Sequence, residues 1–441
     1  MHPVIRALVF ISGCVWATSA CTTGSGAESI PEAALYYPID LSYHATSQTL
    51  YVLNTNYDGR YDHGWISEID LTKLAALETQ ETLSLDAYAQ GAMPVLSYGG
   101  GLLLDETTNT LFASHRGADT ISLIEADATT GRLLCRGDGV TSKVCDAEHR
   151  FIFSSDEFTF DAPSALSDPF KMRLNAHPLD AEKSILLVGH AGTGRLSVLD
   201  ISAQDKSAAQ VLANRSIYLG GDGNSAMAIH PDTSAGLFAS LGTQLSTSDG
   251  VRGKMYHVDL SKALAQSTEQ IVFSHSVNSA VYSRELNSMV FSEKGDYAYV
   301  TSRSPDALLV FSAEVRADTY MQIDSSQEQS ASWPHFELLF AHAFSGQPTG
   351  LASWSTDSED YLAVANFEDS SVTFFSVAGA SLLVAGKIQN VGEGLVALKR
   401  IDVGESKLLL ALGFESHTLG VMDVSGNTPE NFKVLVKVGG P

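Results

Sequence analysis

The feature that most constrains the fold of this chain is a two-strand unit that occurs seven times along its 441 residues. Each copy has an apolar run of four or five residues, a polar loop, and a second run in which apolar residues alternate. Short apolar runs between turn-forming residues predict β-strands, and self-similarity along a chain predicts a repeat architecture. The first runs of the seven copies are Leu50–Asn54, Leu111–Ser114, Leu186–Gly189, Leu237–Ser240, Ala298–Ser302, Leu362–Asn366 and Leu409–Leu412.

Two more candidate strands flank the hairpin, as Ala226–Pro231 and Gln270–Ser274 do around the fourth copy. Four strands per repeat make one blade of a β-propeller, and closing the ring hides the sheet edges. We therefore predict an all-β fold, a single seven-bladed β-propeller of four-stranded antiparallel blades over residues 34–441. An insertion is expected at residues 138–168, between the second and third blades, and six or eight blades are the alternatives if that stretch is assigned wrongly.

The two ends of this region are expected to meet where the ring closes. The apolar run Phe432–Val438 predicts the last strand of the last blade. The segment Ala34–Tyr37 is expected to add a strand beside it and so to latch the ring.

Several copies carry a recognisable signature. The run Tyr299-Val300-Thr301-Ser302 is close to Tyr-Val-Thr-Asn, and Leu362–Asn366 is another form of it. Two of the blades are followed by a Val-Gly pair, Val391-Gly392 and Val438-Gly439. The chain therefore resembles the YVTN-type β-propellers, which are lactonase-like and WD40-like rings. The resemblance implies architecture but no single function, because propellers host many activities.

The N-terminus resembles the signal peptide of a bacterial lipoprotein. Its apolar run Ala7–Ala17 is too short to span a bilayer and ends in Thr18-Ser19-Ala20-Cys21. This ending resembles a lipobox, which implies removal of residues 1–20 and lipidation of Cys21, and Thr22 after it favours the outer membrane. Residues 21–33 would be a flexible tether, and the protein would face the periplasm or the outside. The alternative is ordinary cleavage near Ala20, which would leave Cys21 free.

The roles expected for the other three cysteines follow from their positions in the chain. Cys14 ends a run, Ile11-Ser12-Gly13-Cys14, that fits the lipobox letters better but leaves too short an apolar core, so we expect it to be removed with the signal peptide. Cys135 and Cys145 remain, and an oxidising compartment favours a disulfide between them. A metal-binding pair is the alternative.

The formal net charge of −24 limits the partners. Such a polyanion is repelled by phosphate backbones, so nucleic acid is not expected to bind. The expected partner is an envelope protein, a peptide or a glycan, with membrane contact only through the lipid anchor.

A polar loop in the first repeat is spaced like a calcium site. Asn54, Asn56 and Asp58 place oxygen atoms at alternate positions, and Asp62 follows a glycine. The match departs from a calcium loop at its first position, Asn54, and at Trp65, where a bidentate glutamate is expected. Calcium is therefore a candidate cofactor, and an ordinary polar hairpin loop is the alternative.

A second candidate site is the set of loops just past the first strand of each repeat, which surrounds one mouth of the channel in propellers. Histidine, arginine and asparagine converging there could bind an anion or a metal, or perform acid–base chemistry. The alternative is that these side chains face solvent or satisfy backbone groups. The residues are His115, Arg116, His190, Arg195, Arg303 and Asn366.

Most of the second runs end in an acidic residue, and this repetition indicates structure rather than chemistry. We expect these side chains to accept hydrogen bonds from backbone groups of the following turn. They are Asp70, Glu125, Asp200, Asp259 and Asp423.

The sequence contains no Gly-x-Ser-x-Gly elbow, no His-Glu-x-x-His motif, no phosphate loop and no Cys-x-x-Cys-His haem site. The leading hypothesis is therefore a cell-envelope lipoprotein whose propeller is a binding or scaffold module rather than an enzyme. The alternative is a lactonase-like hydrolase or a metal-dependent enzyme in the channel mouth. It requires His115, His190 and an acid within hydrogen-bond reach of one another.

Overall fold

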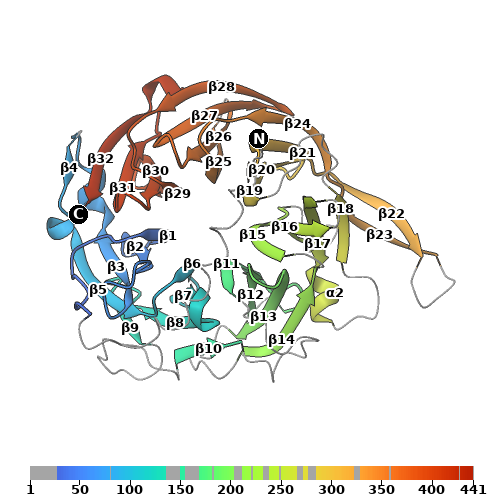
Figure 1. The fold of residues 1–441 in the computed structure, drawn as a ribbon, viewed down its shortest axis with the longest axis horizontal. Helices are drawn as coiled ribbons and strands as arrows, with labels where there is room; N and C mark the ends of the chain where they lie inside the picture. The colour runs from blue at the N-terminus through green and yellow to red at the C-terminus, as the bar shows by residue number, and fades with distance from the viewer. Residues whose placement is uncertain are drawn as a thin grey trace, which may run out of the picture.

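The structure is a computed structural model, and its described residues form sheets arranged in a ring. It describes residues 27–79, 81–135, 149–153, 168–180, 183–202, 211–219, 222–231, 238–247, 250–265, 272–276, 285–321, 328–356, 359–426 and 428–440. These residues form seven sheets of four or five strands, numbered here sheet 1 to sheet 7 in chain order, and one separate hairpin. The sheets follow one another around a common centre, which confirms the predicted all-β propeller (Figure 1).

The strands have equivalent places in each sheet, from the centre outward. The innermost strands are β1 (Pro38–His44), β6 (Gly99–Asp105), β11 (Pro169–Ala176), β15 (Asp222–Ile229), β19 (Leu286–Phe291), β25 (Pro348–Ser355) and β29 (Leu395–Val403). The second strands are β2 (Thr49–Asn54), β7 (Thr110–His115), β12 (Lys183–His190), β16 (Phe238–Thr247), β20 (Tyr297–Arg303), β26 (Asp360–Asn366) and β30 (Ser406–Gly413). The third strands are β3 (Gly64–Asp70), β8 (Thr120–Ala126), β13 (Arg195–Ser202), β17 (Gly250–Asp259), β21 (Asp306–Ser312), β27 (Ser371–Ala378) and β31 (Thr418–Asp423).

The outer strands vary most. Those of sheets 1, 3, 4, 5, 6 and 7 are β5 (Ala89–Val95), β14 (Val211–Tyr218), β18 (Val272–Ser276), β24 (Glu337–Ala343), β28 (Ser381–Ile388) and β32 (Lys433–Gly439). Sheet 5 also has an inserted hairpin, which points away from the ring in Figure 1 and consists of β22 (Val315–Met321) and β23 (Glu328–Pro334).

Sheet 2 departs from the four-stranded pattern. Its third strand pairs along one edge with two three-residue strands, β9 (Leu133–Cys135) and β10 (Arg150–Ile152). The prediction of seven four-stranded blades is therefore wrong in number, since six sheets have a single outer strand that continues the antiparallel order. The cause is the segment between β9 and β11, where the insertion was expected. Residues 136–148 and 154–167 of that segment lie outside the described part of the chain.

The core consists of hydrophobic clusters, one at each junction between neighbouring sheets. Side chains alternate between the two faces of a strand, and both faces of each sheet are covered by neighbours. In β2, Leu50 and Val52 pack toward sheet 7, whereas Tyr51 and Leu53 pack toward sheet 2. This two-sided burial explains why the second strand of each sheet, which is the first run of each repeat in the sequence, is apolar throughout rather than alternating.

The acids at the ends of third strands hold the chain where it turns. Asp70 caps helix α1 (Leu71–Ala75), accepting from the amides of Thr72 and Lys73, and Asp259 caps α2 (Leu260–Leu264) through the amide of Lys262. The side chain of Asp423 accepts a 2.9 Å hydrogen bond from the Ser425 amide. The structural role predicted for these three acids is confirmed, because each accepts hydrogen bonds from backbone amides at the start of the following helix or turn.

The ring closes differently from the prediction. The outer strand β32 completes sheet 7, as expected, but its free edge pairs in parallel with β4 (Thr82–Leu83), which follows helix α1. The Thr79 amide adds a 2.7 Å hydrogen bond to the Leu435 carbonyl. The predicted latch at Ala34–Tyr37 is wrong, because these residues form no strand and the Tyr36 amide instead donates to Asn54 Oδ1 at 2.8 Å.

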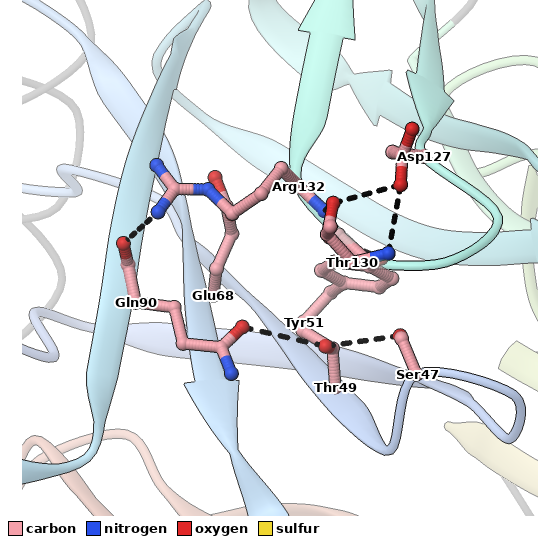
Figure 2. Close-up of polar contacts among 9 residues, drawn as sticks. Ser47, Thr49, Tyr51, Glu68, Gln90, Asp127, Thr130 and Arg132 are labelled. Carbon is pink, nitrogen blue, oxygen red and sulfur yellow. Dashed lines mark hydrogen bonds and ion pairs between the residues drawn. The ribbon is translucent and has the colours of Figure 1, made fainter.

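Beside the hydrophobic cluster at the junction between sheets 1 and 2 lies a set of polar side chains (Figure 2). The Glu68 side chain is only 3% exposed, and its carboxylate lies 2.8 Å from Nε of Arg132, which also donates to the Gln90 carbonyl. The buried hydroxyl of Tyr51 donates to the Gly131 carbonyl at 2.7 Å. Burial raises the pKa of Glu68 to about 7, although the charge of Arg132 opposes the shift.

Candidate functional site

The predicted mouth residues all lie at one face of the ring, here called the upper face, where second and third strands are connected. His115, His190 and Asn366 are the last residues of β7, β12 and β26. All three side chains are fully buried within their own sheets. The fold therefore places them at equivalent positions without bringing them together.

Each of these side chains bonds to a hydroxyl seven residues further along the chain, on the neighbouring third strand. His115 Nε2 lies 2.9 Å from Ser122 Oγ, and His190 Nε2 lies 2.8 Å from Ser197 Oγ. Asn366 donates to Thr373 Oγ1 at 3.1 Å. Burial lowers the pKa of His115 to about 3, so its imidazole is neutral. These bonds hold the hairpins, and ligand binding by these three residues stays a prediction.

The three predicted arginines lie on different sheets, and each contacts its own neighbours. Arg116 makes a bidentate ion pair with Asp168, with Nε–Oδ1 and Nη2–Oδ2 distances of 2.6 and 2.9 Å. The guanidinium of Arg195 lies 5.4 Å from the ring of Tyr218. Arg303 donates to the Gln347 side chain at 2.8 Å and lies 5.7 Å from the ring of Phe367.

In the predicted calcium loop, the oxygens of three of the four residues accept hydrogen bonds within the protein. Asn54 accepts from the Tyr36 amide, and Asn56 Oδ1 accepts from the Tyr61 amide at 3.0 Å. Asp58 Oδ2 accepts from the Tyr36 hydroxyl at 2.6 Å. The amide of the fourth residue, Asp62, donates to the Glu28 carbonyl.

No cluster of three or more histidine, cysteine or acidic residues suited to a metal ion occurs in the described part of the chain, and calcium stays a prediction.

Most of the cysteines with a predicted role lie outside the described residues. Cys21 and Cys145 lie outside the described residues, while Cys135 is buried at the end of β9. The disulfide and the lipid anchor therefore also stay predictions. In the described segments, no helix is long and apolar enough to cross a membrane.

A basic cluster lies on the innermost strands, where no site was predicted. It consists of Lys171 and Arg173 on β11 and Lys399 on β29. Between these two strands lie β1 and β6, and Asp40 on β1 is the acid that interacts with all three cations. All four side chains are half-buried.

The electrostatics of the basic cluster are unbalanced. Burial lowers the pKa of Lys171, Arg173 and Lys399, and the charge of Asp40 opposes this in each case. Arg173 lowers the pKa of both lysines further, because like charges disfavour each other. Among the described residues, neither lysine has an ion-pair partner, and the ammonium of Lys171 lies 4.8 Å from the ring of Phe170. Three cations thus surround Asp40, with Glu106 as a second acid near Lys399, on a chain whose net charge is strongly negative.

Backbone groups hold together the innermost strands around the basic cluster. The carboxylate of Asp40 accepts hydrogen bonds from the amides of Leu41 and Leu102 at 2.9 and 3.1 Å, which joins β1 to β6. A Cβ on Gly101 would lie 2.6 Å from the Phe170 carbonyl oxygen, so glycine is required for β11 to approach β6. The run Gly99-Gly100-Gly101 was the signal in the sequence that could have located the cluster.

The comparisons with known proteins agree with this architecture. No family model and no curated protein matches the chain. A protein from Lactobacillus plantarum has a TM-score of 0.55 at 15% identity, over 83% of this chain and 88% of its own. Hydrazine synthase from Kuenenia stuttgartiensis has a TM-score of 0.54 at 13% identity, over 90% and 98%. A candidate 6-phosphogluconolactonase from Bacteroides fragilis has a TM-score of 0.50 at 14% identity, over 93% and 96%. These likenesses establish the fold alone.

Proposed function

We propose that this protein is a cell-envelope lipoprotein whose propeller binds an oxyanion, a carboxylate or a phosphate, at the basic cluster. The ligand would be a small molecule or the acidic group of a peptide or glycan. The proposal rests on one observation, the three half-buried cations gathered around Asp40 on the innermost strands.

Half-buried charges of one sign are costly without a counterion. Lys171 and Lys399 have no acidic partner within ion-pair distance among the described residues, and Arg173 lowers the proton affinity of both lysines. A bound oxyanion would accept hydrogen bonds from the ammonium groups and the guanidinium, and charge-assisted bonds of this kind are the strong ones. The rest of the chain is strongly negative, so cations gathered at one place are better explained by a specific anionic ligand than by a general role on the surface.

The hydrolase alternative has no support beyond the fold. It required the two histidines to converge with an acid, whereas His115 and His190 are buried in different sheets and each bonds to its own serine. The likeness to a candidate lactonase at 14% identity carries no activity with it.

The test is isothermal titration calorimetry on the protein produced from the full chain. The probes are inorganic phosphate, citrate and glucuronate, with N-methylacetamide as the uncharged control and calcium chloride as the cationic probe. We expect at least one of the three anions to bind, and Arg173→Gln to weaken that binding about thirtyfold, because a charge-assisted hydrogen bond contributes about 2 kcal/mol. Calcium heat lost in Asp58→Ala would instead locate a metal in the predicted loop.

The matched control is Lys387→Gln, which removes one positive charge from the outer strand β28, where Lys387 pairs with Asp369. It should leave the anion affinity within twofold of the wild type. Absence of binding by all three anions, or equal losses in Arg173→Gln and Lys387→Gln, would refute the proposed site.

The envelope location has its own test. In a host with lipoprotein processing, the full chain should incorporate labelled palmitate and sediment with membranes, and Cys21→Ser should abolish both. Incorporation that persists in Cys21→Ser but is lost in Cys14→Ser would move the anchor. Absence of label in the wild type would contradict the lipoprotein assignment.

A further inference from the structure

A cavity lies at the face of the ring opposite the upper face, between sheets 5 and 6, and Arg400 of sheet 7 also lines it. Its volume is about 330 Å³, and it opens where the innermost strands β19 and β25 end. This is at the small end of the range for ligand pockets in proteins. Its walls combine aromatic rings with charged groups, and those used below are Tyr299, Trp354, Tyr361, Glu293, Asp360 and Arg400.

The cavity exists because a turn that fills the equivalent junction elsewhere is short here. Between sheets 1 and 2, the turn Asp127–Arg132 of sheet 2 reaches the hydroxyl of Tyr51. In sheet 6, only Gly379 and Ala380 connect β27 to β28. A Cβ on Gly379 would lie 3.5 Å from the hydroxyl of Tyr297, so this turn lies near Tyr297 rather than filling the space beside Tyr299.

Two buried donors at this cavity have no partner within the described residues. They are the hydroxyl of Tyr299 and Nε1 of Trp354, whose side chains are 1% and 8% exposed. A buried polar group without a partner costs about 1–3 kcal/mol, so such groups are usually satisfied by water or a ligand. Burial, and then the charge of Asp360, raise the pKa of Tyr299, so its hydroxyl keeps its proton and can donate.

The remaining groups define what the ligand must offer. The carboxylates of Glu293 and Asp360 can accept hydrogen bonds, and Arg400, whose terminal nitrogens bond to Asp402, has a buried Nε without a partner among the described residues. The rings of Trp354 and Tyr361 lie 5.7 Å apart in the hydrophobic cluster between sheets 6 and 7, and both residues border the cavity from sheet 6. The ligand must therefore accept hydrogen bonds, donate them, and present an apolar face to aromatic rings.

We propose that this cavity binds a neutral saccharide unit. The hydroxyl groups of a sugar both donate and accept, and the C–H face of a pyranose ring packs on aromatic side chains. A small anion would be repelled by the two carboxylates, and an apolar ligand would leave the buried donors unsatisfied. The inference goes beyond the proposed function, because none of the residues of this cavity belongs to the basic cluster.

The test is titration of the full chain with glucose, galactose, N-acetylglucosamine, cellobiose and chitobiose. At least one of these sugars should bind, and Tyr299→Phe should weaken it at least tenfold by removing one hydroxyl. The matched control Tyr297→Phe makes the same change two residues away, outside the cavity, and should leave the affinity unchanged. Trp354→Phe removes the indole donor but keeps a ring, and should also weaken binding.

Two further measurements distinguish a loss of sugar binding from a loss of fold and from an effect of the basic cluster. Urea unfolding should show that Tyr299→Phe folds as stably as the wild type, so that a loss of affinity is not a loss of fold. Arg173→Gln should bind the sugar normally, which separates this cavity from the basic cluster. The inference is overturned if no sugar of the panel binds, if Tyr299→Phe and Tyr297→Phe bind equally well, or if glucuronate binds here more tightly than glucose.

Discussion

Two junctions of the same ring, sheets 1–2 and sheets 5–6, begin from nearly the same sequence and end with opposite properties. Tyr51 and Tyr299 occupy equivalent positions on second strands, and both are buried against the next sheet. The hydroxyl of Tyr51 is bonded to Gly131, whereas that of Tyr299 has no partner among the described residues and lines a cavity.

A repeat fold leaves room for function in its turns rather than in its strands. The strands at both junctions are fixed by the same two-sided burial, so they cannot change without loss of the core. The turns are free to differ in length, and a turn that is four residues shorter leaves a polar cavity in place of the Glu68–Arg132 pair.

The largest effect is expected at the two turn glycines. Gly131 has a φ of +68°, and a Cβ there would lie 2.3 Å from Ser47 Oγ and 2.8 Å from Thr49 Cβ. Gly131→Ala should therefore lower the free energy of unfolding by about 3 kcal/mol, from strain and overpacking together. Gly379→Ala has a similar φ of +60° but an ordinary 3.5 Å contact, and should cost only about 1 kcal/mol. Equal losses in urea unfolding would mean that the sheet 1–2 turn is not tightly packed.

The second effect is a pH dependence of the free energy of unfolding that arises at the junction between sheets 1 and 2. The pKa of Glu68 is about 7 in the folded protein, above its ordinary 4.5, so the folded state favours the protonated form. That stability is fully present below pH 4.5 and is lost as the pH rises through 7, by about 3 kcal/mol relative to Glu68→Gln. Urea unfolding of both proteins between pH 4.5 and 8 measures it. A difference that is flat, or that grows with pH in favour of the wild type, would show that Arg132 keeps Glu68 ionised.

The smallest effect compares the two tyrosines directly. Tyr51→Phe should lower the free energy of unfolding by about 1 kcal/mol, because it leaves the Gly131 carbonyl without its donor. Tyr299→Phe, measured without sugar, should change it by less than about 0.5 kcal/mol, since no bond within the described residues is lost. A similar loss in both variants would mean that Tyr299 has a structural partner, and the two junctions would then be alike.

The sequence was sufficient for the fold because burial on both faces of each sheet makes the second strands apolar throughout. It was not sufficient for the outer edges, where few side chains are buried. The two short strands β9 and β10 on sheet 2, and the use of Thr82–Leu83 rather than Ala34–Tyr37 at the closure, depend on contacts between distant segments. Such contacts leave no periodic pattern in the sequence.

The site was harder to predict for a related reason. His115 and His190 stood out because they are polar and occupy equivalent positions, but this equivalence reflects a bond to Ser122 and Ser197 that the hairpin itself needs. The residues of the basic cluster do not recur at equivalent positions in the other repeats. Its members are far apart in the chain, and only the closed ring brings β11 and β29 to the two sides of Asp40.

The most direct test of anion binding at the basic cluster is NMR of the full chain with ¹³C-dimethylated lysines, titrated with inorganic phosphate. Resonances are assigned with Lys171→Gln and Lys399→Gln, and Lys387 serves as the internal control. We expect the pKa values of Lys171 and Lys399 to start below the ordinary value for lysine and to rise as the anion binds, while Lys387 does not respond. Resonances of Lys171 and Lys399 that do not move with phosphate, or that move no more than that of Lys387, would contradict it.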